Sequence, residues 1–448
     1  MKASDPERCG GADSTGMRLE THITGGKEIF SRASLVLLIA LLLGSTTINF
    51  IDRQVLSVLA PVLRDEFHLS NSNYAAILNA FMITYALAMP LAGWVLDQLG
   101  VGLGLSLAVV WWSAAALLTS LAHGAVSMGC FRSLLAMGES GSWPSFAKAV
   151  AIWVPEKART LALGVCNSGS SLGAMIAPVL VVYLTARFGW RAAFLVTGSL
   201  GFLWVVAFQG FRLSHPQMKM TDRGDTGSAS SRTSWRELLR YRQTWSVFVC
   251  RFLADPLWYF FVFWIPEFLT RERRLRLGMI GAIVWIPFLV GGFSNLATGW
   301  IALMMQRAGW SVHRTRKSLM LVGAMMSPIG IAAAFANSLF WTMAFICVAI
   351  FFWMAWSITV QTLPGDIFPT SAVASVFGIS GFGSTIGSVI SIWLVGWILD
   401  STGSYPAVFL MLGFLMPLAY FLGTLLMGRI EPVQLTHGSS RRRQGPVE

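Results

Sequence analysis

Four charged side chains lie in or beside stretches that are otherwise apolar: Asp52 and Arg53 are adjacent, and Arg132 and Glu139 are seven residues apart. In a helix, seven residues make two turns and place Arg132 and Glu139 on one face, whereas adjacent residues point about 100° apart. A guanidinium binds carboxylates through paired hydrogen bonds, and carboxylates exchange protons. These residues therefore indicate anion binding and proton exchange. The alternative is structural pairing, Asp52 with Arg132 and Glu139 with Arg53.

Arg251 and Asp255 form another pair of opposite charges, four residues apart near one end of a later apolar run. Side chains one helical turn apart can pair locally or cap the helix. We favour that interpretation over contact with a substrate.

Uncharged polar side chains inside the apolar runs are further candidates for lining a cavity. For each of them alone, a hydrogen bond between helices is about as good an explanation as a substrate contact. The candidates are Tyr85, Asn167, Ser170, Gln361 and Ser384.

The composition identifies the elements that must position these residues. Of 448 residues, 55% are hydrophobic and 12% are charged, whereas soluble domains have about 25% charged residues. The apolar residues come in runs of about 20, enough for a helix to cross a ~30 Å hydrocarbon core. Barrel strands would instead alternate over about 10 residues. The sequence predicts an all-α integral membrane protein, in which a buried charge is costly and usually functional.

Twelve apolar runs follow one another, and one long polar insert divides them six and six. We predict an N-terminal tail at 1–33, a six-helix half at 34–211, a central loop at 212–244, a second half at 245–429 and a C-terminal tail at 430–448. The runs lie near 34–52, 75–96, 104–122, 126–151, 161–186, 191–211, 245–269, 279–303, 318–336, 341–363, 373–398 and 406–428.

The two halves match each other when the chain is shifted by 214 positions. The shift places Pro155 on Pro369, Gly164 on Gly378, Gly169 on Gly383, Gly173 on Gly387 and Gly189 on Gly403. Parallel repeats of this kind are typical of transporters that bind their substrate between the halves near the middle of the membrane. The glycines are expected to allow close helix packing.

The basic residues predict the orientation of the chain. Most of the 33 Lys and Arg residues share one side of the membrane if both tails are cytoplasmic, as the positive-inside rule requires. The basic cluster at 271–276 runs against this rule. The N-terminal tail lacks the apolar core and cleavage site of a signal peptide. We predict a multi-pass membrane protein with both tails in the cytoplasm; a bacterial inner membrane is implied only by the resemblance described below.

Several other classes of protein are disfavoured. The net charge of +12 is explained by membrane orientation, and no basic amphipathic stretch with aromatic residues indicates nucleic-acid binding. The five cysteines and six histidines show no disulfide framework and no metal-ligand spacing. Gly169-x-Ser171-x-Gly173 fits a hydrolase motif, but that motif needs a strand–turn–helix context. An enzyme or a transporter-like receptor is therefore a remote alternative.

Residues 34–430 resemble the Major Facilitator Superfamily, and within it the anion:cation symporters. INFIDR, FRSLLAMGESGSWP and FGWRAAF carry this resemblance. A closer resemblance, to bacterial hexuronate transporters, is carried by IDRQVLSVLAPVLRDEF, AKAVAIWVPEKARTLALGVCNSGSSLGA, DPLWYFFVFWIPEFL and AGWSVHRTRK. The resemblance implies twelve transmembrane helices in two pseudo-symmetric halves.

The resemblance also implies roles for individual residues. Asp52 and Glu139 match carboxylates that carry protons, Arg132 matches an arginine that modulates them, and Arg53 matches the arginine that meets the substrate carboxylate. Tyr85 matches a tyrosine that contacts substrate. Asn167, Gln361 and Ser384 fall where related carriers line the cavity, and Ser170 is grouped with them.

The sequence departs from the family pattern at two places. Phe50 stands where related carriers often have tyrosine, so one hydroxyl toward the substrate is missing. The segment 93–100 keeps Gly93 and Asp97 of a gating motif but has no Arg or Lys after them. We expect the contacts that close this side to be weaker or different.

Together these features predict proton-coupled uptake of a sugar-acid anion, with a hexuronate as the leading substrate and no cofactor besides protons. Another organic anion is the alternative, either an aldonate such as galactonate or a dicarboxylate. A dicarboxylate would need a second cation, and Arg132 is the candidate in the sequence. The protein is expected to work as a monomer in the lipid bilayer.

Overall fold

The computed structural model describes residues 31–69, 71–218, 235–264, 268–269, 271–275, 283 and 285–433. Most of the two predicted tails, about half of the central loop (219–234) and the last residue of the basic cluster lie outside the described residues. The described residues form helices and connecting turns, with no strand among them.

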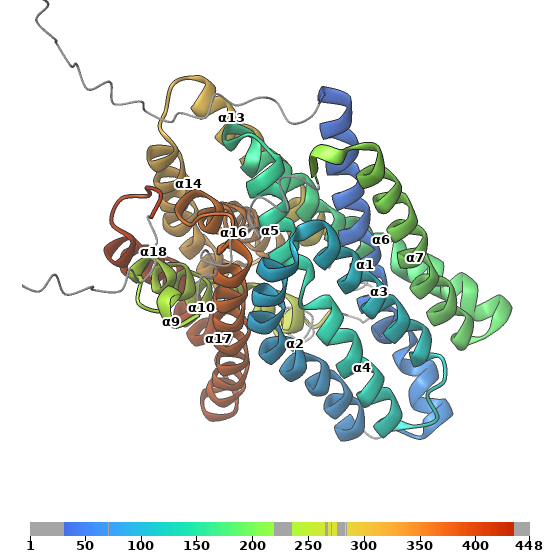
Figure 1. Ribbon diagram of the computed structural model, residues 1–448. Coiled ribbons are helices and arrows are strands. Elements are labelled where there is room, and N and C mark those ends of the chain that lie inside the picture. Colours follow the sequence, from blue (N-terminus) through green and yellow to red (C-terminus); the bar gives the residue numbers. More distant parts are fainter. Residues whose placement is uncertain are drawn as a thin grey trace, which may run out of the picture.

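The first half of the chain contains a bundle that Figure 1 colours from blue to green. Its helices are α1 (Arg32–Phe67), α2 (Asn71–Leu99), α3 (Val101–Thr119), α4 (Ala125–Glu139), α5 (Ser142–Trp153), the 3₁₀ turn η1 (Glu156–Ala158), α6 (Arg159–Phe188) and α7 (Trp190–Ser214).

The second bundle runs from yellow-green to red in Figure 1. It follows the short helix α9 (Trp235–Leu238) and consists of α10 (Arg242–Phe263), α13 (Trp285–Arg307), α14 (Val312–Met326), η2 (Ser327–Ile331), α15 (Ala332–Phe335), α16 (Leu339–Ile367), α17 (Val373–Thr402) and α18 (Tyr405–Met427).

Within the described residues, each predicted apolar run coincides with a helix or with a broken series of helices. Ten helical segments in this part of the chain are long and apolar enough to cross a membrane. The runs without such a segment are 126–151, which folds as α4 and α5, and 245–269, which begins in α10. These two regions contain the charged pairs Arg132/Glu139 and Arg251/Asp255.

Helix α1 is longer than its apolar run predicts. The prediction placed Asp52 and Arg53 at the end of a span, but α1 continues to Phe67 and places both in its middle. The continuation is helical because Val55, Leu56, Leu59 and Leu63 recur at helical spacing and are buried in one apolar cluster. The polar residues between them interrupt the apolar run without interrupting the helix.

The two bundles repeat the same packing. Helix α1 packs along α6 in the first, and α10 packs along α17 in the second. Gly189 ends α6 and Gly403 ends α17, both with positive φ (84° and 65°), a conformation that glycine adopts without steric cost. The bundles meet where α2 packs on α17 and α6 packs on α13.

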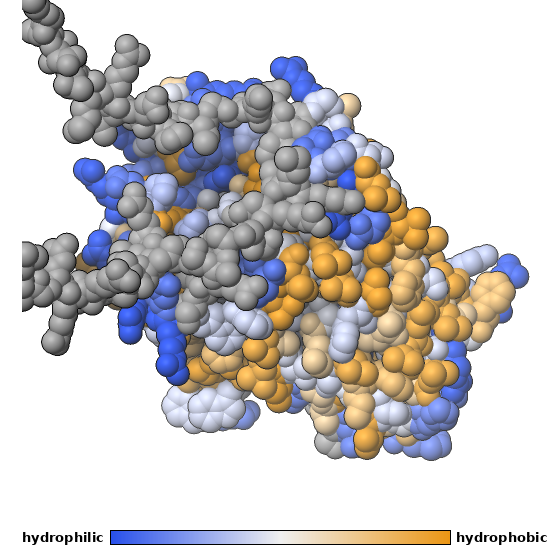
Figure 2. All heavy atoms as spheres, viewed as in Figure 1, coloured by the Kyte–Doolittle hydropathy of each residue, from blue (hydrophilic) through white to orange (hydrophobic). Residues whose placement is uncertain are grey.

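Apolar side chains cover much of the outer surface. Figure 2 shows them gathered in a broad area over the N-terminal bundle, where exposed residues include Val179, Val182, Leu203 and Val206. Soluble monomers rarely expose apolar patches of this extent. The surface fits contact with lipid.

Candidate functional site

A cavity lies between the two bundles, in the position that the repeat predicts. It contains all six residues predicted to bind substrate, so the structure brings them together, although their binding role stays a prediction. The lining residues are Phe50, Arg53, Tyr85, Met89, Trp143, Asn167, Ser170, Arg251, Asp255, Trp258, Tyr259, Asn295, Trp353, Met354, Ser357, Gln361, Phe377, Gly381, Ser384 and Thr385.

Arg53 is paired with Glu139 across two helices. Its Nε and Nη2 donate to the same carboxylate oxygen, Oε2, at 2.9 and 2.6 Å. The Arg53 side chain is 25% exposed and Glu139 is fully buried, while the second oxygen of Glu139 has no hydrogen-bond partner. One side of the Arg53 guanidinium therefore faces the cavity, and the Glu139 carboxylate binds it from the other side.

Aromatic rings surround the Arg53 guanidinium. Its Cζ lies 5.3 Å from the ring centroid of Phe50, 5.2 Å from Phe81 and 5.0 Å from Tyr85. A cation over aromatic faces is stabilised by their quadrupoles. The rings restrict the guanidinium to a small region at the cavity wall.

A helix break positions Glu139. Helix α4 ends at this residue and α5 begins at Ser142. Pro144 has no backbone N–H to donate to the carbonyl of Ser140, so the helical ladder cannot continue unchanged through this turn. The break places a buried carboxylate at a helix end facing α1.

Asp52 and Arg132 do not form the ion pair that the sequence suggested. Nη1 of Arg132 donates to the backbone carbonyl of Asp52 at 3.4 Å and Nη2 donates to that of Arg53 at 3.2 Å. Both Asp52 carboxylate oxygens are buried without a hydrogen-bond partner. Arg132 thus contacts the backbone of α1, and neither Arg132 nor Asp52 lines the cavity.

Amides from the two bundles meet at the cavity. Asn167 Nδ2 donates to Gln361 Oε1 at 3.2 Å, and Gln361 Nε2 donates to Ser357 at 3.1 Å. Ser170 donates to the carbonyl of Asn167 at 2.7 Å. These neutral groups join α6 to α16 and offer donors and acceptors suited to a polyhydroxylated molecule.

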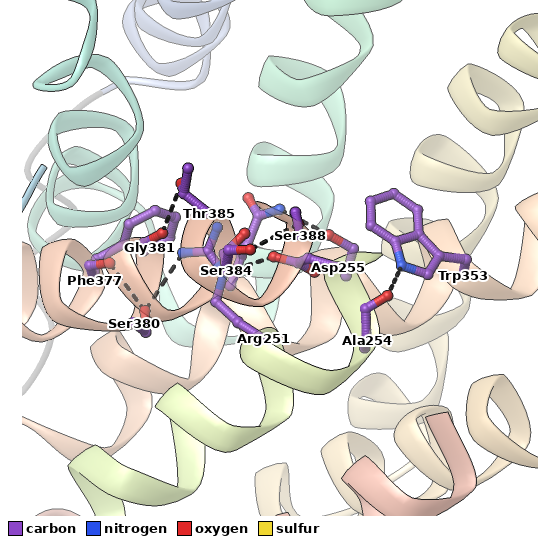
Figure 3. Close-up of polar contacts among 12 residues, drawn as sticks. Arg251, Ala254, Asp255, Trp353, Phe377, Ser380, Gly381, Ser384, Thr385 and Ser388 are labelled. Carbon is purple, nitrogen blue, oxygen red and sulfur yellow. Dashed lines mark hydrogen bonds and ion pairs between the residues drawn. The ribbon is translucent and has the colours of Figure 1, made fainter. Parts of the chain in front are cut away.

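The pair Arg251 and Asp255 lies in the middle of α10 and lines the cavity (Figure 3). Arg251 Nε is 3.3 Å from Asp255 Oδ2, and Nη1 is 3.4 Å from Ser380 Oγ. The local pairing expected from sequence is present, but the pair is not a cap near a helix end. Helix α10 begins at Arg242, and its packing on α17 turns this face inward.

The cavity contains other residues that sequence reasoning did not assign. Trp258 and Trp353 stack with ring centroids 5.1 Å apart, and Trp353 Nε1 donates to the carbonyl of Ala254 at 2.8 Å. Asn295 and Tyr259 also line it. The available signal for Trp258 and Tyr259 was the segment DPLWYFF, in which an aspartate precedes a cluster of aromatic residues.

The gating residues join the bundles at the end where α1 begins. Asp97 accepts a hydrogen bond from Lys148 Nζ at 2.8 Å and from the backbone N–H of Ser375 at 2.7 Å. Ser375 is in the first turn of α17, where unpaired N–H groups attract an anion. The contact is of the different kind that the missing basic residue predicts, because Lys148 of α5 supplies the cation.

A second group of charged residues makes further contacts between the bundles at the same end. Arg159 of α6 donates to the carbonyl of Gly365 at 2.8 Å and lies 3.4 Å from Asp366. Asp366 also pairs with the buried Arg316 at 2.8 Å, and Arg316 donates to Thr160 of the other bundle. One ion pair, between Arg159 and Asp366, and the hydrogen bonds of Arg159 and Arg316 thus connect the two bundles at this end.

The glycines predicted to be structural sit at close helix contacts. A Cβ on Gly93 would collide with the carbonyl of α17 residue Ala374, and one on Gly169 or Gly173 would collide with α1. Gly383 and Gly387 meet α10 in the same way. The hydrolase-like Ser171 is inside helix α6, which lacks the turn that its motif requires.

Comparisons with known proteins agree with this architecture. The sequence profile of the Major Facilitator Superfamily matches residues 42–360. The hexuronate transporter of Escherichia coli (strain K12) is 32% identical over 423 residues, which cover 89% of this chain and 96% of that protein. The galacturonate transporter of Dickeya chrysanthemi is 30% identical over 305 residues, covering 64% and 88%.

Among solved structures, the proton:xylose symporter XylE bound to 6-bromo-6-deoxy-D-glucose superposes with a TM-score of 0.71. It is 15% identical, and the match covers 90% of this chain and 98% of that one. This similarity concerns the fold alone. From the profile match and the relatives, the chain belongs to the Major Facilitator Superfamily, a family of membrane transporters and not of enzymes.

Proposed function

We propose that this protein is a proton-coupled symporter that takes up a sugar-acid monoanion, with a hexuronate as the substrate. The observation that carries the proposal is the contact between Arg53 and Glu139: a cation on the cavity wall is held by a fully buried carboxylate at 2.6 Å. The hexuronate and galacturonate transporters among its relatives support the choice of substrate.

Proton binding and substrate binding are linked through the same arginine in this proposal. A proton on Glu139 removes the charge that holds Arg53, and the guanidinium then turns to the substrate carboxylate. Without substrate or a charged Glu139, Arg53 would be a desolvated cation with no partner, which is costly. The proton and the anion therefore favour each other's binding.

Asp52 supplies the second proton site. Its buried carboxylate has no partner, and an ionised carboxylate in that position would carry a large desolvation cost. We infer that Asp52 holds its proton in this conformation. Releasing it would leave a charge beside Arg132, whose guanidinium already contacts the same turn of α1, and would favour rearrangement of that helix pair.

The conformation corresponds to a cavity closed toward the cytoplasm. We place both termini in the cytoplasm, following the distribution of basic residues, and the protein in a bacterial inner membrane, following the bacterial transporters among its relatives. The contacts that join the bundles, between Asp97 and Ser375 and between Arg159 and Asp366, then lie at the cytoplasmic end. Alternating access requires these contacts to open, and we propose that a single chain performs the cycle.

The test is uptake of labelled galacturonate and glucuronate into proteoliposomes, with and without an inward proton gradient. Uptake driven by the gradient and abolished by an uncoupler is the expected result. Absence of uptake by folded protein would discard the hexuronate assignment.

An aldonate such as galactonate, or a dicarboxylate, is the alternative substrate. Counterflow with a panel of these anions separates the possibilities. The cation that a dicarboxylate would need is not Arg132, which contacts backbone carbonyls away from the cavity wall. It is Arg251, which lines the cavity.

A further inference from the structure

The cavity wall holds two arginines, one from each bundle, and each has a carboxylate partner. Arg53 is paired with Glu139 and Arg251 with Asp255. Tyr85 and Tyr259 lie within electrostatic reach of both arginines, so the two cations face one shared space. A molecule with an anionic group at each end would complement this wall if both arginines were free.

The two carboxylates differ in where they lie. Glu139 is behind Arg53 and outside the set of cavity-lining residues, whereas Asp255 itself lines the cavity next to Arg251. The side chains of Arg251 and Asp255 are 12% and 9% exposed. A group approaching Arg251 therefore meets a negative charge at the same place.

We propose that Asp255 makes the cavity select a monocarboxylate over the matching dicarboxylate; this inference rests on the proposed function. With its carboxylate at Arg53, the substrate presents its hydroxyl-bearing end to Arg251 and Asp255. Neighbouring hydroxyls both donate and accept, so they match a guanidinium beside a carboxylate. A second carboxylate can only accept, and it would be repelled by Asp255.

Neighbouring side chains fix the position of the Arg251–Asp255 pair at the cavity wall. Arg251 lies over the ring of Phe377, with its Cζ 4.8 Å from the centroid, and is near the hydroxyl of Ser380. The stacked rings of Trp258 and Trp353 line the same cavity. Their faces suit the apolar C–H surface of a sugar.

The experiment compares galacturonate with galactarate, its dicarboxylate counterpart, by calorimetric titration of the purified full-length protein. Wild-type protein is expected to prefer galacturonate. Asp255→Asn removes the negative charge and frees Arg251, so the ratio of the two dissociation constants should shift toward galactarate by at least ~10-fold, a change typical of a charge-assisted contact.

The double variant Arg251→Gln/Asp255→Asn is the matched control. It keeps the amide at position 255 but lacks the cation, so the gain in galactarate binding should disappear. Asp255→Ser provides a second test of the same charge if the asparagine variant does not fold.

The outcomes separate the two proposals. An unchanged ratio in folded Asp255 variants that still bind galacturonate would overturn the role of Asp255 and leave the proposed function intact. Wild-type protein that binds no galacturonate would overturn the proposed function and this inference with it.

Discussion

The two bundles use their charges in different ways. In the N-terminal bundle, Asp52, Arg132 and Glu139 are buried behind the cavity wall, and Arg53 reaches it. In the C-terminal bundle, Arg251 and Asp255 both line the cavity beside stacked tryptophans. The carboxylates of the N-terminal bundle lie outside the cavity lining, whereas Asp255 of the C-terminal bundle is part of it.

The two ion pairs differ in whether they connect two helices or lie on one helix, and this difference indicates different roles. Arg53 and Glu139 join α1 to the end of α4, so breaking their contact frees two helices from each other. Arg251 and Asp255 are one turn apart on α10, and breaking their contact releases only a side chain. The first pair is suited to coupling and the second to recognition.

The largest effect is expected from Glu139→Gln, which removes the proton site but keeps the shape of the side chain. Arg53 then remains free of a charged partner, so exchange between equal pools of substrate should continue while accumulation against a gradient falls to the equilibrium level. Counterflow and proton-driven uptake in proteoliposomes measure the two activities.

Glu66→Gln is the matched control, because Glu66 is 45% exposed in a 3.7 Å pair with Arg191 and such surface pairs contribute little. Continued accumulation by Glu139→Gln would show that Glu139 is not the coupling residue. The different roles assigned to the two bundles would then be wrong.

Asp97→Asn removes the carboxylate that pairs with Lys148 inside the N-terminal bundle and accepts a hydrogen bond from Ser375 of the other bundle. Lys148 is fully buried, and removing the partner of a buried charge typically costs about 3–5 kcal/mol. The thermal midpoint of the purified protein should fall, and the closed cytoplasmic end should open more readily. Asp97→Asn combined with Lys148→Met should recover much of the lost stability, since no charge is then left unpaired. Equal loss in the single and double variants would contradict the argument.

Arg53→Lys tests the proposed contact between Arg53 and the substrate carboxylate. Lysine keeps the charge but presents a single ammonium group in place of the guanidinium fork. Loss of one charge-assisted contact of about 1.5–3 kcal/mol weakens substrate binding by roughly 10–150-fold. Calorimetric titration with galacturonate measures this, and Arg191→Lys on the outer surface is the control. Near-normal affinity in Arg53→Lys would exclude Arg53 as the carboxylate-binding residue.

Residue types and the internal repeat are enough to predict much of this architecture. Charges are rare in apolar runs, so Arg53 and Glu139 stand out, and their contact is one of the two pairings that the sequence left open. The shift that aligns Gly169 with Gly383 predicts equivalent helix contacts, which α6 makes with α1 and α17 makes with α10.

Other contacts depend on helix rotation and long-range packing, which residue spacing does not specify. Lys148 reaches Asp97 from 51 positions away, so the missing basic residue beside Asp97 correctly predicts a different contact but does not identify the residue that makes it. Arg132 turns to the backbone of α1 and not to the Asp52 carboxylate. The one-turn spacing of Arg251 and Asp255 correctly predicts a pair, but only the packing of α10 shows that the pair faces the cavity.

The smallest effect is expected where the bundles share a neutral contact. Gln361→Ala removes the hydrogen bond between Asn167 and Gln361, which spans α6 and α16 at 3.2 Å. A neutral hydrogen bond contributes about 0.5–1.5 kcal/mol, so galacturonate affinity should fall only roughly 2–12-fold, and proton-driven accumulation should persist.

A double-mutant cycle with Asn167→Ala separates the contact between the bundles from separate contacts with substrate. Additive losses would mean that each amide acts on the substrate alone, whereas a coupling energy near the full loss would mean that the amides act as one unit across the two bundles. Loss of accumulation in Gln361→Ala would show that coupling extends beyond the buried charges of the N-terminal bundle, and the division of labour between the bundles would not hold.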